Sequence, residues 1–397
     1  MVARTDRADD AQADQRGGNV YDLKFSSARL KRVASADPSS AALLERLLGI
    51  AVSGLARTYR DGDFVFRLDG SRAPGGSWQL AASGTSLRYA AIAALGLLRL
   101  PEQAQRRVLE GDTCSALIGK LTKRLGEMTS RGDVALVCWA AAEGGHGDLP
   151  LAFSRLAQLD QPESPGYVVD AAWVVSALIA MRPHADVEEH LDRARRSLLA
   201  ARGAVLYPHV KGSGARWYRT HVGSFADQVY PLQALARLHA SSDDPDALAV
   251  AEMVADKICA VQGEAGQWWW HYDSRNGNVI EGYPVYSVHQ HAMAPMALLD
   301  LADAGGTCHL HAITRGLQWL GSPPETDEEL IASGSPITWR KVARKDPRKA
   351  VRGLRAVSTR IRPEWRLRVL DRVVPPGIVD HECRPYELGW LLMTWLT

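Results

Sequence analysis

The sequence predicts an all-α protein, a single domain in which helical hairpins close into an (α/α)6-type toroid. Of the 397 residues 46% are hydrophobic and 23% are charged, which is a globular composition with enough apolar material for a large core. Strand signals, meaning alternating Val, Ile and Thr runs between hairpin turns, are nearly absent. Instead, one pattern recurs, in which a loop with Gly or Pro precedes a helix of Ala, Leu and other small apolar residues.

Six segments carry this pattern and are apolar on nearly every face, so we expect them to be buried helices. They are 84–100, 132–143, 167–181, 223–240, 286–301 and 383–396. More amphipathic segments lie between them, as at 41–59, 187–202 and 245–262, and are typical of outer helices with one solvated face. Pairing inner with outer helices predicts a closed ring, because stacked neighbours bury faces that no single hairpin covers.

The N-terminal segment and the cysteines indicate the cellular compartment that we expect for the protein. Residues 1–38 are expected to be a disordered leader, since the N-terminus lacks the apolar stretch of a secretory signal, and 39–397 to form the toroid. No run of about 18 uninterrupted apolar residues predicts a membrane span. Five scattered cysteines argue against a disulfide framework and for a reducing compartment. The expected location is cytoplasmic, with peripheral membrane attachment as an option.

The inner helices of such a ring start at one end, so the polar and aromatic residues at their starts should line a shared cavity. Helix N-termini also favour acidic side chains and anionic ligands. An alternative for the two aspartates of the second and third inner helices is that they satisfy backbone donors there. The residues at these starts are Arg88, Tyr89, Asp133, Asp170, Asp227, Gln228, Tyr230, Tyr286, His289, Gln290, His291, Arg384, Tyr386 and Glu387.

Aromatic residues are densest at 267–291. Trp268, Trp269 and Trp270 cannot all face one core, because neighbouring side chains point in different directions, so at least one should line the cavity or face solvent. Trp and Tyr suit sugar rings through an apolar face and a polar edge. The alternative is that two of the three tryptophans are core packing. Nearby residues expected to bind substrate are His271, Asp273 and Tyr283.

Acid/base chemistry is predicted for Asp227 and Glu281 as carboxylates, with His289 and Tyr286 as proton-transfer partners. Desolvation by the tryptophans would raise one carboxylate pKa and leave another ionised. Asp273 is alternatively a turn former. His289 and His291 point about 200° apart on a helix, so both could bind one metal only in an extended loop. Because no cysteine or carboxylate lies around them at a zinc-ligand spacing, we expect no metal and no cofactor.

Two basic segments suggest partners. His209, Lys211, Arg216, Arg219 and His221 lie before the 223–240 helix and suit an anionic substrate such as a uronate or a phosphate-bearing ligand, although a solvated loop is equally compatible. From Arg340 to Arg372 there are 13 Lys and Arg against 3 Asp and Glu. Arg344, Arg348, Arg352 and Arg355 fall at helical spacing, so the basic outer segment 339–372 could be a helix that meets an anionic membrane surface or an acidic protein, or merely a solvated helix. Nucleic acid is not expected.

The helix-pair pattern resembles the α/α-toroid superfamilies. One branch holds terpenoid cyclases and protein prenyltransferases, and the other holds six-hairpin glycosidases, with sugar epimerases nearby. The segment from Gln262 to Trp268 resembles the Gln-x3-Gly-x-Trp core of the repeat in squalene-type cyclases. However, the acidic Asp-x-Asp-Asp motif of one cyclase class is absent. The Asp-rich metal motif of the other class is missing too, because Ser242–Asp246 lies before an outer helix and is better explained as a helix cap.

We therefore predict an acid/base enzyme that hydrolyses, eliminates or epimerises a carbohydrate or glycan precursor in an aromatic cavity. The partner would be a small-molecule, sugar or lipid-linked substrate. A terpenoid-cyclase-like enzyme on a polyprenyl substrate and a non-catalytic scaffold or docking protein are the alternatives.

Overall fold

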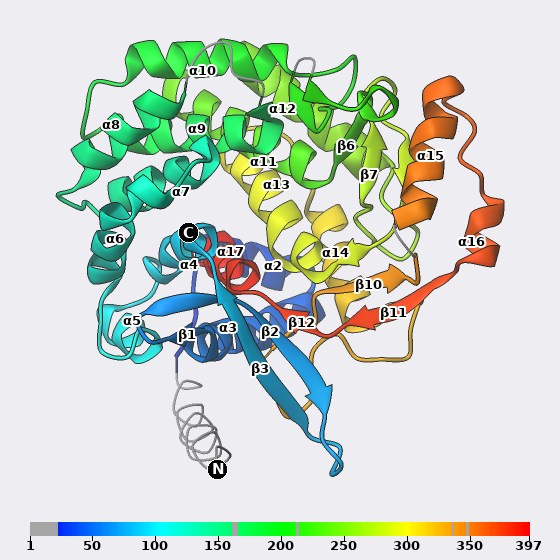
Figure 1. Cartoon of the computed structure of the whole chain (residues 1–397), viewed down its shortest axis with the longest axis horizontal. Coiled ribbons are helices and arrows are strands. Elements are labelled where there is room, and N and C mark those ends of the chain that lie inside the picture. The colour runs from blue at the N-terminus through cyan, green and yellow to red at the C-terminus, as the bar shows by residue number, and fades with distance from the viewer. Residues whose placement is uncertain (1–22, 161–165, 212–213, 336, 347–348) are drawn as a thin grey trace.

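The computed structural model describes residues 23–160, 166–211, 214–335, 337–346 and 349–397. Its helices form a ring (Figure 1). The six inner helices each overlap one of the six predicted apolar segments, so this prediction is confirmed. They are α4 (Leu87–Leu97), α7 (Arg131–Glu143), α9 (Val168–Met181), α11 (Ala226–Ser242), α13 (Ala294–Asp303), which follows a π-helical turn (His289–Met293), and α17 (Pro385–Leu396).

The inner ring closes between its first and last helices. Each inner helix packs on the next, from α4 through α7, α9, α11 and α13 to α17, and α17 packs back on α4. Two glycines make this last contact close: a Cβ built on Gly96 would lie 2.3 Å from the carbonyl oxygen of Gly389, and one built on Gly389 would lie 2.6 Å from that of Ile92. A larger residue at either position would force the two backbones apart.

Outer helices cover the ring from outside. They are α3 (Pro38–Thr58), α6 (Cys114–Lys123), α8 (Leu149–Leu159), α10 (Glu188–Ala200), α12 (Pro245–Ala260) and α14 (Leu310–Gly321), with the short α5 (Glu102–Val108) beside α3. By length and composition α3 could cross a membrane, but 61% of its apolar window is buried within the protein. Its contacts with α17, α14 and α2 explain its apolar character as core packing.

Short strands, which were not predicted from the sequence, gather where the inner helices begin. A strand ends within three residues of the start of five inner elements: β3 (Trp78–Thr85), β4 (Gly166–Tyr167), β6 (Val222–Ser224), β9 (Val285–Tyr286) and β12 (Glu382–Cys383). They pair antiparallel with β2 (Asp63–Arg72), β5 (Val210–Lys211), β7 (His271–Asp273) and β10 (Lys341–Arg344); β1 (Tyr59–Arg60), β8 (Val279–Glu281) and β11 (Pro376–Asp380) complete these small sheets. The strands therefore form the rim around the helix starts.

Two boundary predictions need correction. Residues 1–22 of the predicted leader lie outside the described residues, but its later part contains α2 (Ala28–Ala36), so the expectation of disorder is wrong there. Arg29 fixes this helix, because its guanidinium donates to Asp300 at 2.5 Å and to Asp303 at 2.9 Å.

The basic outer segment 339–372 is not one helix. Arg344 lies on β10, whereas Arg352 and Arg355 lie on α15 (Ala350–Ile361), and α16 (Val369–Val373) follows. Arg348 lies outside the described residues. The helical spacing of the arginines was therefore misleading, because antiparallel pairing with β11 and β9 holds 341–344 as a strand.

Candidate active site

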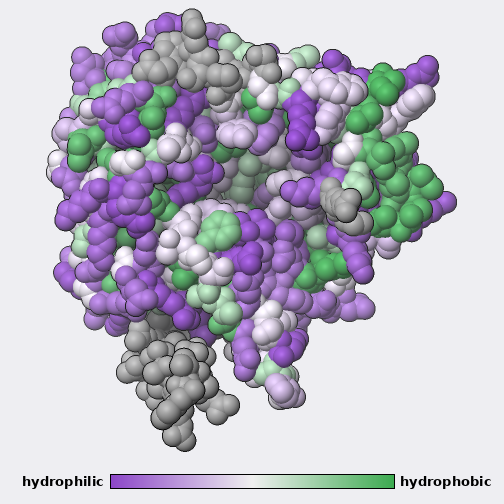
Figure 2. Space-filling model, in the orientation of Figure 1, coloured by the Kyte–Doolittle hydropathy of each residue, from purple (hydrophilic) through white to green (hydrophobic). Residues whose placement is uncertain are grey.

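The candidate site lies at the rim end of the inner helices, where the molecular surface is hollowed near the centre of the face in Figure 2. Arg88, in the first turn of α4, forms an ion pair with Asp133, in the first turn of α7. Its guanidinium also lies 5.3 Å from the ring of Trp173 on α9. Residues from three consecutive inner helices therefore meet, although Trp173 carried no signal in the sequence analysis beyond its apolar helix.

Asp170, in the first turn of α9, belongs to the same group. It is 8% exposed and accepts a hydrogen bond from Ser130 Oγ at 3.2 Å. Burial raises the pKa of Asp170, and the nearby charge of Asp133 adds to the rise, while Arg88 acts in the opposite direction. Neither aspartate caps its helix through a side-chain hydrogen bond, so the capping alternative does not explain them.

Aromatic rings join this group to the closing helix α17. The ring of Tyr89 lies 4.7 Å from that of Tyr386, and Tyr230 lies 5.1 Å from Trp173. Arg384 donates to the Tyr89 hydroxyl at 2.9 Å and is itself paired with Glu382 at 2.7 Å. These contacts bring residues more than 290 positions apart in the sequence into one cluster.

Glu387 lies deeper, in the first turn of α17. It is fully buried, and neither of its oxygens accepts a hydrogen bond from the described residues. Arg340 Nε lies 3.5 Å from one oxygen, and the same guanidinium lies 5.0 Å from the ring of Tyr286. Burial raises the pKa of Glu387 to about 7, and Arg340 opposes this rise. Arg340 was counted in the basic segment but was not predicted to lie here.

Of the three tryptophans, only Trp270 faces this cluster. Its ring lies 4.8 Å from Tyr286 and is stacked at 5.9 Å on His289. Trp268 is fully buried against Phe225, and Trp269 points away, with its ring 5.8 Å from Tyr283. The three side chains therefore have different neighbours, although all three pack on the main core.

The histidines differ in how far solvent reaches their rings and in the direction in which their pKa values are shifted. Burial lowers the pKa of His289 and of His291 to about 3 and that of His271 well below its usual value, so all three are neutral near pH 7. His209 is different: its side chain is 47% exposed, and its Nδ1 lies 3.1 Å from Asp227, whose hydrogen bond raises the pKa of His209. The ring of the exposed Tyr167 lies 4.9 Å from His209.

Asp227 is the buried partner of this pair. It is 0% exposed and accepts from the Ser224 backbone N–H at 2.6 Å and from Ser224 Oγ at 2.7 Å. Its contact with His209 makes it a group that orients the imidazole. Its predicted neighbour Gln228 is also buried, where its amide bonds the backbone of Tyr207.

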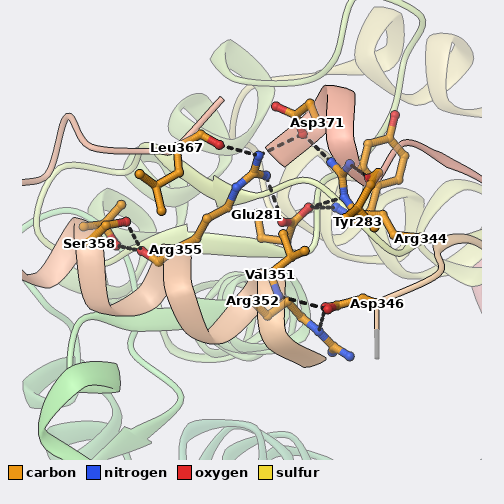
Figure 3. Close-up of polar contacts among 12 residues, drawn as sticks. Glu281, Tyr283, Arg344, Asp346, Val351, Arg352, Arg355, Ser358, Leu367 and Asp371 are labelled. Carbon is orange, nitrogen blue, oxygen red and sulfur yellow. Dashed lines mark hydrogen bonds and ion pairs between the residues drawn. The ribbon is translucent and has the colours of Figure 1, made fainter. Parts of the chain in front are cut away.

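Glu281 lies outside the cluster, on β8. Its two carboxylate oxygens accept from Arg344 at 3.2 Å and from Arg355 at 2.8 Å, and Asp371 bridges the same two arginines (Figure 3). Tyr283 lies beside this network with its backbone N–H on Glu281. The predicted catalytic role of Glu281 stays a prediction, but its oxygens are already engaged by two buried guanidinium groups.

Other predicted residues also have local partners. Asp273 receives two hydrogen bonds from the Arg275 guanidinium, at 2.9 and 2.7 Å, in the turn between β7 and β8. Gln290 bonds the backbone of Tyr286 and Trp268. Of the basic loop, His221 is buried against Thr359, and Arg216 is exposed. The side chain of Lys211 lies outside what the structure describes.

Arg219 is a half-buried member of this loop. Its side chain forms no hydrogen bond or ion pair within the described ranges, although Asp227 lies in its electrostatic neighbourhood. Burial lowers the pKa of Arg219, and the nearby Arg352 and Arg216 lower it further. A half-buried cation without a bonded carboxylate is a suitable place for an anionic ligand group.

Comparisons with known proteins agree with this architecture. No family model matches the sequence, and neither does any curated protein. Among solved structures, an unsaturated glucuronyl hydrolase from Bacillus sp. GL1 is similar with a TM-score of 0.56 and 12% identity, covering 89% of this chain and 95% of that one.

Two further structures are similar to the same extent. The unsaturated glucuronyl hydrolase of Streptococcus agalactiae has a TM-score of 0.54 and 10% identity, covering 96% of this chain and 94% of that one. An unsaturated glucuronyl hydrolase specific for heparin has a TM-score of 0.53 and 13% identity, and the match covers 89% of this chain and 95% of that one. The chain thus has the six-hairpin α/α-toroid fold that the sequence predicted. These neighbours are carbohydrate-processing enzymes.

Proposed function

We propose that this protein is an acid/base enzyme that acts on a carbohydrate, and that its substrate carries an anionic sugar such as a uronate. The observation that carries the proposal is the pair Asp133 and Asp170 at the starts of adjacent inner helices, around the shared Arg88. Glycan cleavage commonly uses two carboxyl groups in unlike environments, one of which donates a proton. The glucuronyl hydrolases with the same fold make a sugar substrate the favoured class.

Asp170 is the proposed general acid. Its raised pKa keeps a larger fraction of the carboxyl group protonated than in an exposed aspartate, so it can donate a proton to a leaving-group oxygen. Asp133, paired with Arg88, supplies the second carboxylate. We assign the acid to Asp170 and not to Glu281, one of the two carboxylates predicted from the sequence, because Asp170 lies beside Arg88 and Asp133, whereas both oxygens of Glu281 are bonded by arginines.

Anionic recognition is proposed for Arg219 and His209. Arg219 is a half-buried guanidinium without a bonded partner, and His209 is held by Asp227 in a form that gains positive charge more readily. Tyr167, 53% exposed, would stack on a sugar ring beside them. A variant of the Streptococcus agalactiae enzyme was solved in complex with dGlcA-GalNAc6S, so a neighbour of this fold binds such an anionic sugar.

The test is an activity screen on paired oligosaccharides that differ only in carrying a uronate or its neutral sugar. We expect turnover of the uronate member and a loss of about 100-fold or more in kcat for Asp170→Asn, the usual size of a general-acid contribution. Arg219→Gln should raise KM for the uronate member and leave KM for the neutral one unchanged.

The matched control is Asp300→Asn, which alters a mostly buried, ion-paired carboxylate at the other end of an inner helix. It should retain kcat. If Asp170→Asn and Asp300→Asn lost activity equally, the loss would reflect folding. If no oligosaccharide were turned over and site variants kept full biological activity, the scaffold alternative would replace the proposal.

A further inference from the structure

Exposed apolar side chains are concentrated in one short stretch of the chain. Seven large hydrophobic residues there are 37–70% exposed, while the rest of the described chain has three, Leu151, Tyr167 and Trp217. Figure 2 shows hydrophobic colour gathered along the edge formed by α15 and α16, which project from the ring in Figure 1. We call this the apolar edge: Leu354, Ile361, Trp365, Leu367, Val369, Val373 and Ile378.

Arginines are interspersed with these apolar residues. Arg360, Arg362, Arg368 and Arg372 are exposed, and Arg366 is half-buried, against the exposed acids Glu364 and Asp371. Arg366 and Arg368 form no side-chain hydrogen bond or ion pair with any described residue. With Arg344 and Arg355 they line a pocket of about 490 Å³ whose other walls include Trp269 and Tyr283. The edge is therefore both apolar and positively charged.

The apolar edge is held firmly on the ring. Asp371, on α16, accepts from Arg344 at 2.5 Å and from Arg355 at 2.8 Å, and these arginines bind Glu281 in turn (Figure 3). Arg344 also donates to the backbone oxygen of Val374 at 2.6 Å. This network orients α16 so that Val369 and Val373, four residues apart on one helix face, both point outward.

We propose that the apolar edge binds peripherally to membranes that contain anionic phospholipids. Its aliphatic and Trp side chains would enter the boundary between headgroups and acyl chains, where such residues are stable. Arg366 and Arg368 would meet lipid phosphates, which guanidinium groups bind well. Charge complementarity and a projecting shape favour a lipid surface over a protein partner, and this inference does not depend on the proposed enzymatic function.

The experiment is co-sedimentation of the full chain with vesicles of phosphatidylcholine mixed with phosphatidylglycerol, compared with pure phosphatidylcholine. We expect binding to the anionic vesicles, weakened by salt, with a blue shift of fluorescence that Trp365→Phe reduces. Val369→Ser/Val373→Ser and Arg366→Gln/Arg368→Gln should each weaken binding about tenfold or more. Leu151→Ser, an equally exposed apolar residue on α8, should bind as the wild type does.

Other outcomes would overturn the proposal. Equal binding of the wild type and the valine variant would show that the apolar edge is not the contact. Absence of binding, together with a dimer that the valine variant abolishes, would assign the edge to self-association. Salt-sensitive binding to an acidic polypeptide in place of vesicles would assign it to a protein partner. Turnover of a soluble oligosaccharide should be unchanged in the valine variant, which separates this test from that of the proposed function.

Discussion

At the residue scale, the proposed acid is defined by its surroundings. Burial and Asp133 raise the pKa of Asp170, whereas Arg88 lowers it. A general acid must be protonated, so activity should fall as the pH rises through the raised pKa.

This balance gives a pH prediction. Arg88→Gln removes the cation that opposes the rise, so the pKa of Asp170 should increase further, and the alkaline limb of the kcat/KM profile should move to higher pH. The measurement is kcat/KM against pH for both proteins. An alkaline limb that stayed in place would assign that titration to a group outside the influence of Arg88.

Glu387 predicts a pH dependence of stability. Its pKa rises from 4.5 to about 7 in the fold, so the folded chain binds this proton more tightly than the unfolded chain does. The stabilisation is therefore complete below about pH 4.5 and is lost as the pH rises through about 7. Relative to wild type, Glu387→Gln should gain on the order of 2–3 kcal/mol between pH 5 and pH 8. Denaturant unfolding at both pH values measures this, and a pH-independent difference would argue against the raised pKa.

Replacing Glu281 should lower the stability of the fold and change kcat little. Glu281→Gln leaves the buried Arg344 and Arg355 with Asp371 as their remaining carboxylate partner among the described residues, and breaking such a buried pair costs about 3–5 kcal/mol. The midpoint of denaturant unfolding should fall, while kcat of the folded fraction stays near the wild-type value. A stable variant with kcat reduced about 100-fold would restore Glu281 as a catalytic carboxylate.

At the element scale, the inner helices were predictable because their segments are long and apolar on nearly all faces, which is typical of buried helices. The strands were harder, because most of them are two to five residues long and exist only through their partners. The β2–β3 hairpin did carry a signal: Phe64, Phe66 and Leu68 alternate along β2, and Pro74-Gly-Gly follows in the turn. This strand signal is short compared with the helical pattern that dominates the rest of the chain.

The close contact between α4 and α17 should make the fold sensitive to any larger residue placed there. Gly389→Ala places a Cβ 2.6 Å from the carbonyl oxygen of Ile92, so it should lower the free energy of unfolding by about 1–3 kcal/mol or more. Gly353→Ala on α15 is the control, since its Cβ meets nothing within 4 Å and alanine favours a helix. Thermal unfolding of both variants checks this, and equal melting temperatures would contradict the close packing of α4 on α17.

At the scale of the whole molecule, the ring places side chains from distant parts of the sequence around one hollow. The sequence predicted that Tyr89, Asp170, Asp227, Tyr286 and Tyr386 lie at inner-helix starts, which the structure confirms. It could not predict their partners. Arg340, next to a rim strand, reaches Glu387, and His209 pairs with Asp227 from a loop 18 residues earlier. Glu281 is bonded by two arginines that lie 63 and 74 residues away in the sequence. Such pairings depend on how loops cross the rim.

The most direct test of the account is a crystal structure of Asp170→Asn soaked with a uronate-containing oligosaccharide. The account predicts that the sugar lies in the central hollow, with a glycosidic oxygen within hydrogen-bonding distance of residue 170 and the uronate carboxylate on Arg219. A sugar bound only elsewhere, for example in the arginine pocket beside α16, would contradict it.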